Sequence, residues 1–493
     1  AAVGYPVMLK ASWGGGGRGM RGGGKERAVP DAAMQPVAAR EPGAARPAPF
    51  GAASSIEQVA YEHFITAGTP LDRWPDVDER SALGVCHTSG TTGNSKGVVY
   101  SHRSTVLHAM AMLNVDSIAL READVCLTIV PMFHACGWGF PYASGLAGAA
   151  QGVSWRQADP LALVELIERT GATLATAVPT VWIDLLDRLR SGAIDPARLR
   201  TLQRLPVGGA TVSADLIDGY ADFGIRVQHC WGMTEVSPLG LVSTRRSWLS
   251  DEQWSRTRLT PGVPLVGCEM RVVSEDGAVD APGAGASAPS GGAGGPSGGA
   301  GGPDAGASGP GADASMPRDG ASASRDSARV GELQIRGPWV ADAYLDPEAP
   351  DGRGGEDRFD VDAAGRRWLK TGDIATIDAD GYVRIVDRAK DLIKSGGEWI
   401  SSLEIESALT RHPAVREAAV VAVADPRWQE RPVAYLSLAG NWSGPQPDFA
   451  AHLASLLPRW QIPDRFIVLP ELPRNATGKL DKRRIRELAG GAG

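Results

Sequence analysis

The stretch DPLALVELIERTGATLATAVPTVWIDLLDRLR, residues 159–190, decides the fold class because it reads as a helix, a strand and a second helix. Asp159 is a favourable N-cap, Pro160 fits the first helical turn, and Gly171 is placed to end the first helix. The apolar run at 172–179 has the length of a buried strand. Helices that alternate with strands predict an α/β domain, with parallel sheets and crossover helices.

The same alternation extends on both sides of this stretch. Residues 81–90, SALGVCHTSG, read as a short apolar strand that runs into a glycine turn. Near the C-terminus the pattern changes, because a helix at 403–412 leads into two strand-like runs at 415–425 and 431–438. The C-terminal pattern predicts a second, smaller α+β domain.

A chain of 493 residues is too long for one hydrophobic core, so more than one domain is expected. Composition divides it into a glycine-rich fragment at 1–22, a disordered linker at 23–55, a large domain at 56–387 and a small domain at 388–488. The large domain contains a low-complexity insert at 280–328, in which PSGGAGG occurs twice. Its flanks, CEMRVVSEDG and GELQIRG, are expected to be two strands of one sheet, with the insert as an enlarged loop between them.

Charge and cysteine content restrict the class of protein. The formal net charge is −7, so no basic excess points to nucleic acid. The five cysteines show no metal-ligand spacing and predict reduced thiols in a cytoplasmic protein. Residues 125–155 carry no charge, yet their prolines, glycines and His134 favour a buried part of an α/β domain over a membrane span.

The loop TSGTTGNSKG, residues 88–97, has the composition of a polyphosphate-binding loop. Its glycines let the backbone turn around phosphate oxygens, its hydroxyls and amides can donate to them, and its lysine supplies charge. No GK[ST] ends it, so it is not a Walker A loop. The candidate nucleotide-binding residues are Thr88, Ser89, Gly90, Thr91, Thr92, Gly93 and Lys96.

This loop resembles the phosphate loop of the adenylate-forming, or AMP-binding, superfamily. Five further motifs follow in that superfamily's order: VGGA (207–210), WGMTE (231–235), TGD (371–373), DRAKDLIKSGGEWIS (387–401) and PRNATGKLDK (473–482). The nearest resemblance is to bacterial medium- and long-chain fatty-acyl-CoA synthetases, which share VVYSHRS, VPMFHA, AVPTVW and SGGEWISS almost as written here.

The resemblance implies a large domain followed by a small mobile one, and an ATP-dependent acid–CoA ligase. ATP and a carboxylic acid would give an acyl-adenylate and pyrophosphate, and coenzyme A would then displace AMP, with Mg²⁺ required. A fatty acid is the expected substrate. A short thioether acid, an aromatic acid and an inactive remnant stay open as alternatives, as do contact with a membrane surface and a homodimer.

The resemblance also implies roles for individual residues. Lys479 would bridge the carboxylate and the α-phosphate, Glu235 would hold Mg²⁺, and Thr234 would donate to a phosphate. Trp231, where the family commonly has tyrosine, would stack on adenine. Asp373 would accept from the ribose hydroxyls with Arg388 as its companion. The remaining nucleotide positions are Gly208, Gly209, Ala210, Gly232 and Met233.

Three further groups of residues follow from the same resemblance. His134 and Trp138 fall where the family lines its acyl pocket, against the alternative that Trp138 is an ordinary buried aromatic. Lys390 matches the hinge of the small domain. The turn formed by Ser395, Gly396 and Gly397 would come next to coenzyme A after that domain reorients.

Residues 4–21, GYPVMLKASWGGGGRGMR, resemble a different family, the glycine-rich lid of the ATP-grasp domain in biotin-dependent carboxylases. A lid needs the strands and acidic metal ligands of its own domain, so no function is expected for this fragment. The acyl-CoA synthetases carry a longer folded segment before the phosphate loop. The large domain is therefore expected to be truncated at its N-terminus.

Overall fold

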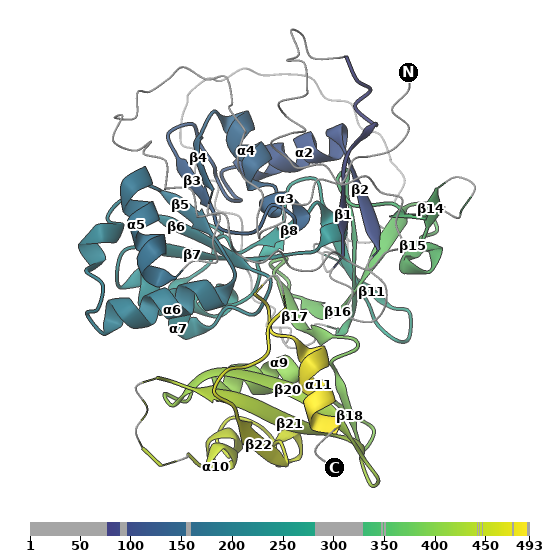
Figure 1. Cartoon of the computed structure of the whole chain (residues 1–493). Helices are drawn as coiled ribbons and strands as arrows, with labels where there is room; N and C mark the ends of the chain where they lie inside the picture. The colour runs from purple at the N-terminus through teal and green to yellow at the C-terminus, as the bar shows by residue number, and fades with distance from the viewer. Residues whose placement is uncertain are drawn as a thin grey trace, which may run out of the picture.

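The computed structural model describes residues 76–88, 96–153, 159–281, 329–346, 349, 352–440, 442, 444–445, 447–475 and 478–490. They form a large domain and a small domain, drawn at the bottom of Figure 1, that carries the C-terminus. The expected fragment at 1–22, the expected linker at 23–55 and nearly all of the insert lie outside the described residues.

The stretch at 159–190 folds as its sequence predicts. Helix α5 (Pro160–Thr170) begins after Asp159, whose carboxylate accepts a hydrogen bond from the Ala162 amide at 3.3 Å. It ends at Gly171, which has the left-handed conformation (φ 63°) that glycine adopts without strain. Strand β5 (Leu174–Thr176) and helix α6 (Pro179–Arg190) follow.

A seven-stranded sheet forms the centre of the large domain, and its first five strands are parallel. The order is β4 (Ala150–Val153), β3 (Val125–Thr128), β5, β6 (Arg204–Gly208), β7 (Arg226–Gly232), β8 (Leu239–Val242) and β9 (Val263–Pro264). The predicted α/β class with crossover helices is confirmed.

The parallel strands are buried on both faces. Leu127, Ala175 and Leu205 belong to one apolar cluster with α5, α6 and α7 (Ala214–Ala221), which gather on one side of the sheet in Figure 1. Cys126 and Leu174 point to the other face, into a cluster with α2 (His102–Leu113) and α4 (Phe140–Ala147). This alternation explains the apolar runs that the sequence shows for these strands.

Two further sheets of the large domain are antiparallel, a pairing that the sequence indicated only for the two strands that flank the insert. One is β1 (Ala82–His87), β2 (Gly97–Ser101), β13 (Tyr344–Leu345) and β14 (Arg353–Gly354). The other contains β11 (Val279–Asp280), β10 (Glu269–Val273), β12 (Gly331–Arg336), β16 (Arg367–Ile377), β15 (Phe359–Val361) and β17 (Val383–Arg388). β10 and β12 pair directly, so the two flanks of the insert lie in one sheet as expected.

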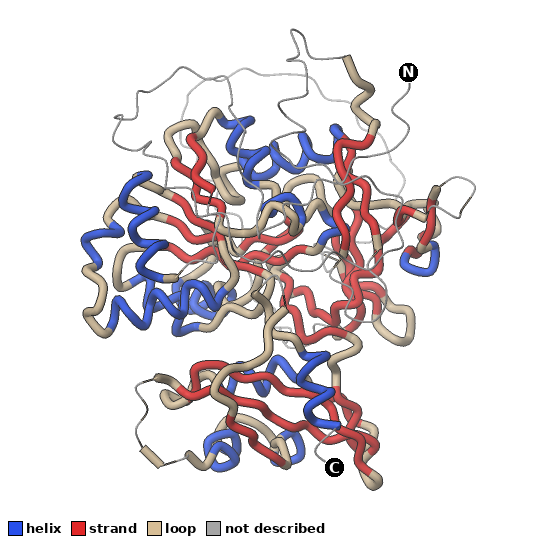
Figure 2. The backbone as a smooth tube through the Cα atoms, viewed as in Figure 1, coloured by secondary structure: helices blue, strands red, loops and turns tan. Residues whose placement is uncertain are grey.

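The small domain contains an antiparallel hairpin of two long strands, β20 (Val415–Asp425) and β21 (Gln429–Leu438), which confirms the α+β prediction. The other strands of its sheet are β18 (Ile393–Ser395), β19 (Glu398–Ile400) and β22 (Arg465–Val468), and its helices are α9 (Ser402–Leu409), α10 (Phe449–Ala454) and α11 (Lys482–Gly490). Figure 2 shows this strand-rich layer with its helices, separate from the larger body.

The uncharged run that begins at Val125 contains β3, a short turn named α3 (Ala135–Trp138), α4 and β4. Within the described ranges, no helix combines the length and the apolar character that crossing a bilayer requires.

Candidate active site

Lys479 of the small domain reaches the large domain at Gly209. A Cβ built on Gly209 would lie 2.7 Å from Cε of Lys479, so a side chain there would displace the lysine, and it would lie in ordinary contact with the Trp138 ring at 3.5 Å. Gly209 follows β6 with φ 83°, a left-handed conformation that also favours glycine. Three residues that are far apart in the sequence therefore meet here: Gly209 of the VGGA motif, Trp138, and Lys479 of the last motif.

A tight turn presents Lys479. The Asn475 amide donates to the Lys479 carbonyl at 2.9 Å, and the Asn475 side chain accepts from the Lys479 amide at 3.2 Å. Gly478 makes this reversal with φ 83°. Arg474 donates to the Gly478 carbonyl at 3.0 Å and to Glu417 of β20, which fixes the turn to the small domain.

Asp373 lies beside this point with two partners from two other motifs. It is 1% exposed, accepts from the Trp231 indole at 2.8 Å and forms an ion pair with Arg388 at 2.6 Å. Asp373 and Arg388 are also directly paired across β16 and β17. Burial raises the pKa of Asp373, and Arg388 opposes that rise.

Electrostatics connect the same residues. Burial, and next the charge of Arg388, lower the pKa of Lys479 from 10.5 to about 8. Burial, and next the charge of Lys479, lower the pKa of His134 to about 4, so its imidazole is neutral at pH 7. A lysine held in this way is a cation whose charge is poorly compensated, which favours an arriving anion.

Trp138 is positioned by an unusual backbone. Ala135, Cys136, Gly137 and Trp138 all have φ between 47° and 64°, so α3 is a left-handed turn of which three residues are not glycine. Such a conformation costs about 1–2 kcal/mol for each non-glycine residue. Strain of this kind gathers at sites where a side chain must be held in one place. Trp138 is 8% exposed, and its ring faces Gly209.

The turn that follows Trp231 carries the candidate acidic residue. Thr234 and Glu235 begin a short 3₁₀ helix (Thr234–Val236), and both side chains are buried. Glu235 accepts a 2.6 Å hydrogen bond from the hydroxyl of Tyr344, whose pKa is raised by burial and by the Glu235 charge. Glu235 also raises the pKa of Asp373, which places the two carboxylates within electrostatic range.

The predicted phosphate loop joins two antiparallel strands, β1 and β2. Thr88 and Lys96 close it: the Thr88 amide donates to the Lys96 carbonyl at 2.9 Å, and the Lys96 amide donates to the Thr88 hydroxyl at 3.1 Å. The Lys96 ammonium lies 4.8 Å from the centre of the Tyr344 ring. Ser89, Gly90, Thr91, Thr92 and Gly93 lie outside the described residues.

The remaining predicted site residues lie beside Gly209, next to the turn that carries Glu235, or between the two domains. Ala210 is exposed beside Gly209, and a Cβ on Gly208 would lie 2.7 Å from the Cys230 carbonyl oxygen. Gly232 and Met233 lead from Trp231 into the acidic turn. Lys390 lies between β17 and β18, where the chain passes from one domain to the other.

The turn at 395–397 is not part of this cluster. The Ser395 hydroxyl accepts from Arg431 at 3.2 Å, and the Gly396 amide donates to the Trp428 carbonyl at 2.8 Å. Gly396 and Gly397 both have positive φ, at 62° and 94°. The contacts described for this turn therefore belong to the small domain itself.

Three contacts of the site were missed by the sequence reasoning. Tyr344 and Tyr100 hold the acidic turn, the latter by donating to the Thr234 carbonyl at 2.7 Å. Arg416 of β20 forms an ion pair with Asp184 of α6 across the two domains. No local pattern marks such partners; an unexplained tyrosine inside VVYSHRS was the one available signal for Tyr100.

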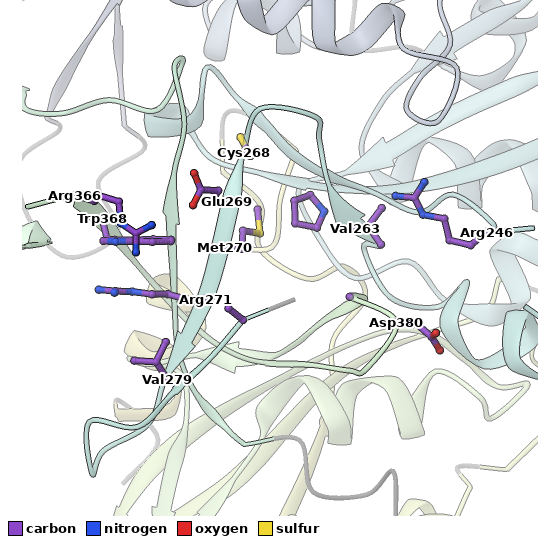
Figure 3. A pocket seen from close by; sticks show the side chains of 13 residues that line it. Arg246, Val263, Cys268, Glu269, Met270, Arg271, Val279, Arg366, Trp368 and Asp380 are labelled. Carbon is purple, nitrogen blue, oxygen red and sulfur yellow. The ribbon is translucent and has the colours of Figure 1, made fainter. Parts of the chain in front are cut away.

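A separate cavity of about 520 Å³ lies between β9, β10 and the loop at Asp380, and none of the predicted site residues lines it (Figure 3). Its wall contains Trp368, whose ring centre is 4.3 Å from the Arg271 guanidinium. Arg271 also donates to Gln334 at 2.7 Å, so its guanidinium already has a hydrogen-bond partner.

All five cysteines are free thiols, and the sulfur atoms of Cys86 and Cys136 are 3.4 Å apart.

Comparison with known families assigns most of the chain. Residues 30–287 match the AMP-binding enzyme family, and residues 404–479 match the C-terminal domain of AMP-binding enzymes. Residues 1–48 match the ATP-binding domain of the carbamoyl-phosphate synthase L chain, which agrees with the ATP-grasp resemblance of the fragment.

Individual relatives are CoA ligases. The chain is 37% identical to 3-methylmercaptopropionyl-CoA ligase of Ruegeria pomeroyi, over 88% of this chain and 71% of the relative. It is 39% identical to long-chain-fatty-acid–CoA ligase of Thermus thermophilus, over 83% and 66%. It is 37% identical to medium-chain-fatty-acid–CoA ligase of Ectopseudomonas oleovorans, over 88% and 69%.

Solved structures share the fold. The o-succinylbenzoate CoA synthetase of Bacillus subtilis, in complex with its acyl-adenylate intermediate, matches with a TM-score of 0.61 and 27% identity, over 83% of this chain and 70% of that one. ATP-bound MatB of Rhodopseudomonas palustris matches with a TM-score of 0.64 and 23% identity, over 84% and 69%.

Proposed function

The chain belongs to the AMP-binding enzymes and is an acid–thiol ligase of that family, and we propose that it joins a fatty acid to coenzyme A through an acyl-adenylate. The position of Lys479 is the observation that carries this proposal. Adenylation brings a carboxylate to the α-phosphate of ATP, and these two anions repel each other. A cation held at Gly209, next to the wall formed by Trp138, would allow the two anions to approach each other.

The nucleotide would lie along the residues grouped around Asp373. Trp231 offers an indole face to the adenine, and its N–H is already directed at Asp373. The buried Asp373 carboxylate can accept from sugar hydroxyls while Arg388 balances its charge. Gly209 and Ala210 are exposed, so their backbone can approach a base edge closely.

Glu235 fits a magnesium ion. Its carboxylate is a hard oxygen ligand of the type that Mg²⁺ prefers, and in the described residues it has no ion pair with lysine, arginine or histidine. Tyr344 uses one lone pair of the carboxylate. Mg²⁺ bound there would neutralise charge on the leaving pyrophosphate. Thr234, next to it, would donate to a phosphate.

The second half-reaction requires another arrangement of the domains. In the arrangement described here Lys479 lies at Gly209, whereas the hydrogen bonds described for the turn at 395–397 join it to its own domain. We infer that the small domain rotates about Lys390 after adenylation, and that this turn then lies beside the thiol of coenzyme A. A cytoplasmic location, contact with a membrane surface and a homodimer stay predictions.

A fatty acid is favoured because two of the three relatives described above act on fatty acids and because Trp138 and His134 give the site an aromatic, uncharged wall at pH 7. The thioether acid of the third relative is the second candidate.

The test is pyrophosphate release by the purified chain with ATP and Mg²⁺, over octanoate, palmitate, 3-methylthiopropionate and cinnamate. We expect the highest kcat/KM with a fatty acid, and acyl-CoA only when coenzyme A is added. A preference for 3-methylthiopropionate would replace the fatty acid by the second candidate. Pyrophosphate release with none of the four acids, from a chain that is folded by circular dichroism, would contradict the proposal.

A further inference from the structure

Two tyrosines hold the turn that carries Thr234 and Glu235. Tyr100 on β2 donates to the Thr234 carbonyl at 2.7 Å, and Tyr344 on β13 donates to the Glu235 carboxylate at 2.6 Å. Their strands are neighbours, because Leu345 of β13 pairs with Gly97 of β2. The acidic turn is therefore attached to the same sheet that carries the predicted phosphate loop.

Tyr344 itself has little freedom to move. It is 4% exposed, and a Cβ on Gly355 would lie 2.4 Å from its ring, so the ring packs directly on backbone. The Phe359 ring lies 6.5 Å from it, centre to centre, and the Lys96 ammonium lies over it at 4.8 Å. A hydroxyl on a ring fixed in this way points at Glu235 without a further loss of rotamer entropy.

The main chain of Glu235 is held from the same segment. Its carbonyl accepts from the Ala341 amide at 2.7 Å, three residues before Tyr344. Both ends of Glu235, the carbonyl and the carboxylate, thus depend on the segment that leads into β13. Packing alone would not require a hydrogen bond to the carboxylate, since a phenylalanine would fill the same space.

We propose that Tyr344 is a positioning residue that orients the Glu235 carboxylate for a divalent cation bound with ATP. The hydroxyl engages one oxygen and leaves the other free for the ion. The residues next to a metal ligand often fix its orientation in this way, and their loss typically weakens metal affinity by about 10–100-fold. This inference rests on the proposed function, which assigns the ion to Glu235.

The test uses Tyr344→Phe, which removes the hydroxyl and keeps the ring. ATP affinity is measured by calorimetry twice, with Mg²⁺ and with EDTA, so that no turnover is needed. We expect the affinity gained from Mg²⁺ to fall about tenfold in the variant, while the affinity for ATP in EDTA is unchanged. Tyr220→Phe is the matched control, because that buried hydroxyl donates to the Trp182 carbonyl at 2.9 Å in another part of the domain.

Gly355→Ala is a second variant, which displaces the Tyr344 ring and should weaken the Mg²⁺ effect in the same direction. An unchanged Mg²⁺ effect in a folded Tyr344→Phe protein would overturn the positioning role and leave the proposed function intact. A wild-type chain that binds ATP equally well with Mg²⁺ and with EDTA would instead remove the assignment of the ion, and this inference with it.

Discussion

Asp184 on α6 and Arg416 on β20 form an ion pair that joins the large domain to the small one. Both side chains are partly exposed, at 41% and 35%, so the pair adds only a modest amount to stability. Its position matters more than its strength, because it spans the two domains in the arrangement that holds Lys479 at Gly209, and the proposed rotation of the small domain would break it. Breaking the pair should therefore change which arrangement of the domains is populated.

We expect Asp184→Asn to slow adenylation by about 1.5–5-fold, which corresponds to the ~0.2–1 kcal/mol typical of such a pair. Thioester formation from synthetic acyl-AMP should not slow. Asp215→Asn is the matched control, since Asp215 pairs with Arg190 at 2.8 Å inside the large domain. The charge reversal Asp184→Arg with Arg416→Asp should restore adenylation, and equal slowing of both half-reactions by Asp184→Asn would contradict this role.

Lys479→Ala should abolish formation of the acyl-adenylate and leave thioester formation from synthetic acyl-AMP largely intact. The reason is that its charge is needed only when two anions meet. Pyrophosphate release measures the first half-reaction, and acyl-CoA formed from acyl-AMP measures the second. Lys482→Ala would not serve as a control because Lys482 pairs with the buried Glu406 at 2.7 Å and supports the fold. An equal loss of both half-reactions in the folded Lys479 variant would show that the lysine has another role.

The activity should also depend on pH through Lys479. With its pKa lowered to about 8, the lysine loses its charge above that pH, and kcat/KM for adenylation should fall as the pH rises further. The unfolded chain keeps this proton up to about pH 10.5, whereas the folded chain loses it above about pH 8. The contribution of this group to the free energy of unfolding therefore increases as the pH rises from 8 to 10.5. Deprotonation of Lys479 therefore does not unfold the protein, and the expected loss of activity reflects the loss of its charge.

Lys479→Arg tests the assignment, because a guanidinium stays charged throughout this range. Its activity should be lower because of the altered geometry, yet without the decline above pH 8. A decline of the same steepness in Lys479→Arg would assign the titration to another group.

Deletion of residues 281–327, with a short Gly-Ser joint, should change the melting temperature by less than about 2 °C. The two ends of the insert already meet, since the Arg329 amide donates to the Asp280 carboxylate at 3.1 Å next to β11 and β12. Scanning calorimetry of the two chains measures the difference. A large decrease would mean that the insert packs against the rest of the molecule.

Local signals in the sequence predicted the elements well. Asp159 and Gly171 mark the two ends of α5 because a cap acts on the few residues beside it. The apolar run at 415–425 coincides with β20. Apart from the hairpin that flanks the insert, the antiparallel pairing in the large domain was not evident, because strand order depends on contacts that periodicity within one strand does not encode.

The site was predicted to a smaller extent, and only where motifs carry it. The sequence motifs predicted that Arg388 accompanies Asp373, and the two side chains form an ion pair at 2.6 Å. Tyr344 is 109 residues from Glu235, and Arg416 is 232 residues from Asp184. The sequence near Glu235 or Asp184 therefore contains no pattern that predicts its partner. The left-handed turn at Ala135–Trp138 was equally hidden, since three of its four residues ordinarily avoid that conformation.

The pairing of Asp373 with Arg388 has a thermodynamic consequence. Arg388 is the last residue of β17, two residues before Lys390, so the carboxylate proposed to hold the sugar is bound to the strand that leads into the proposed hinge. A ligand at Asp373 and the orientation of the small domain then share one free energy of coupling. By reciprocity, whatever factor the closed orientation adds to the affinity for nucleotide, the nucleotide adds to the population of that orientation. If AMP binds at Asp373 and the small domain rotates as proposed, the release of AMP and the rotation of the domain are therefore coupled equilibria.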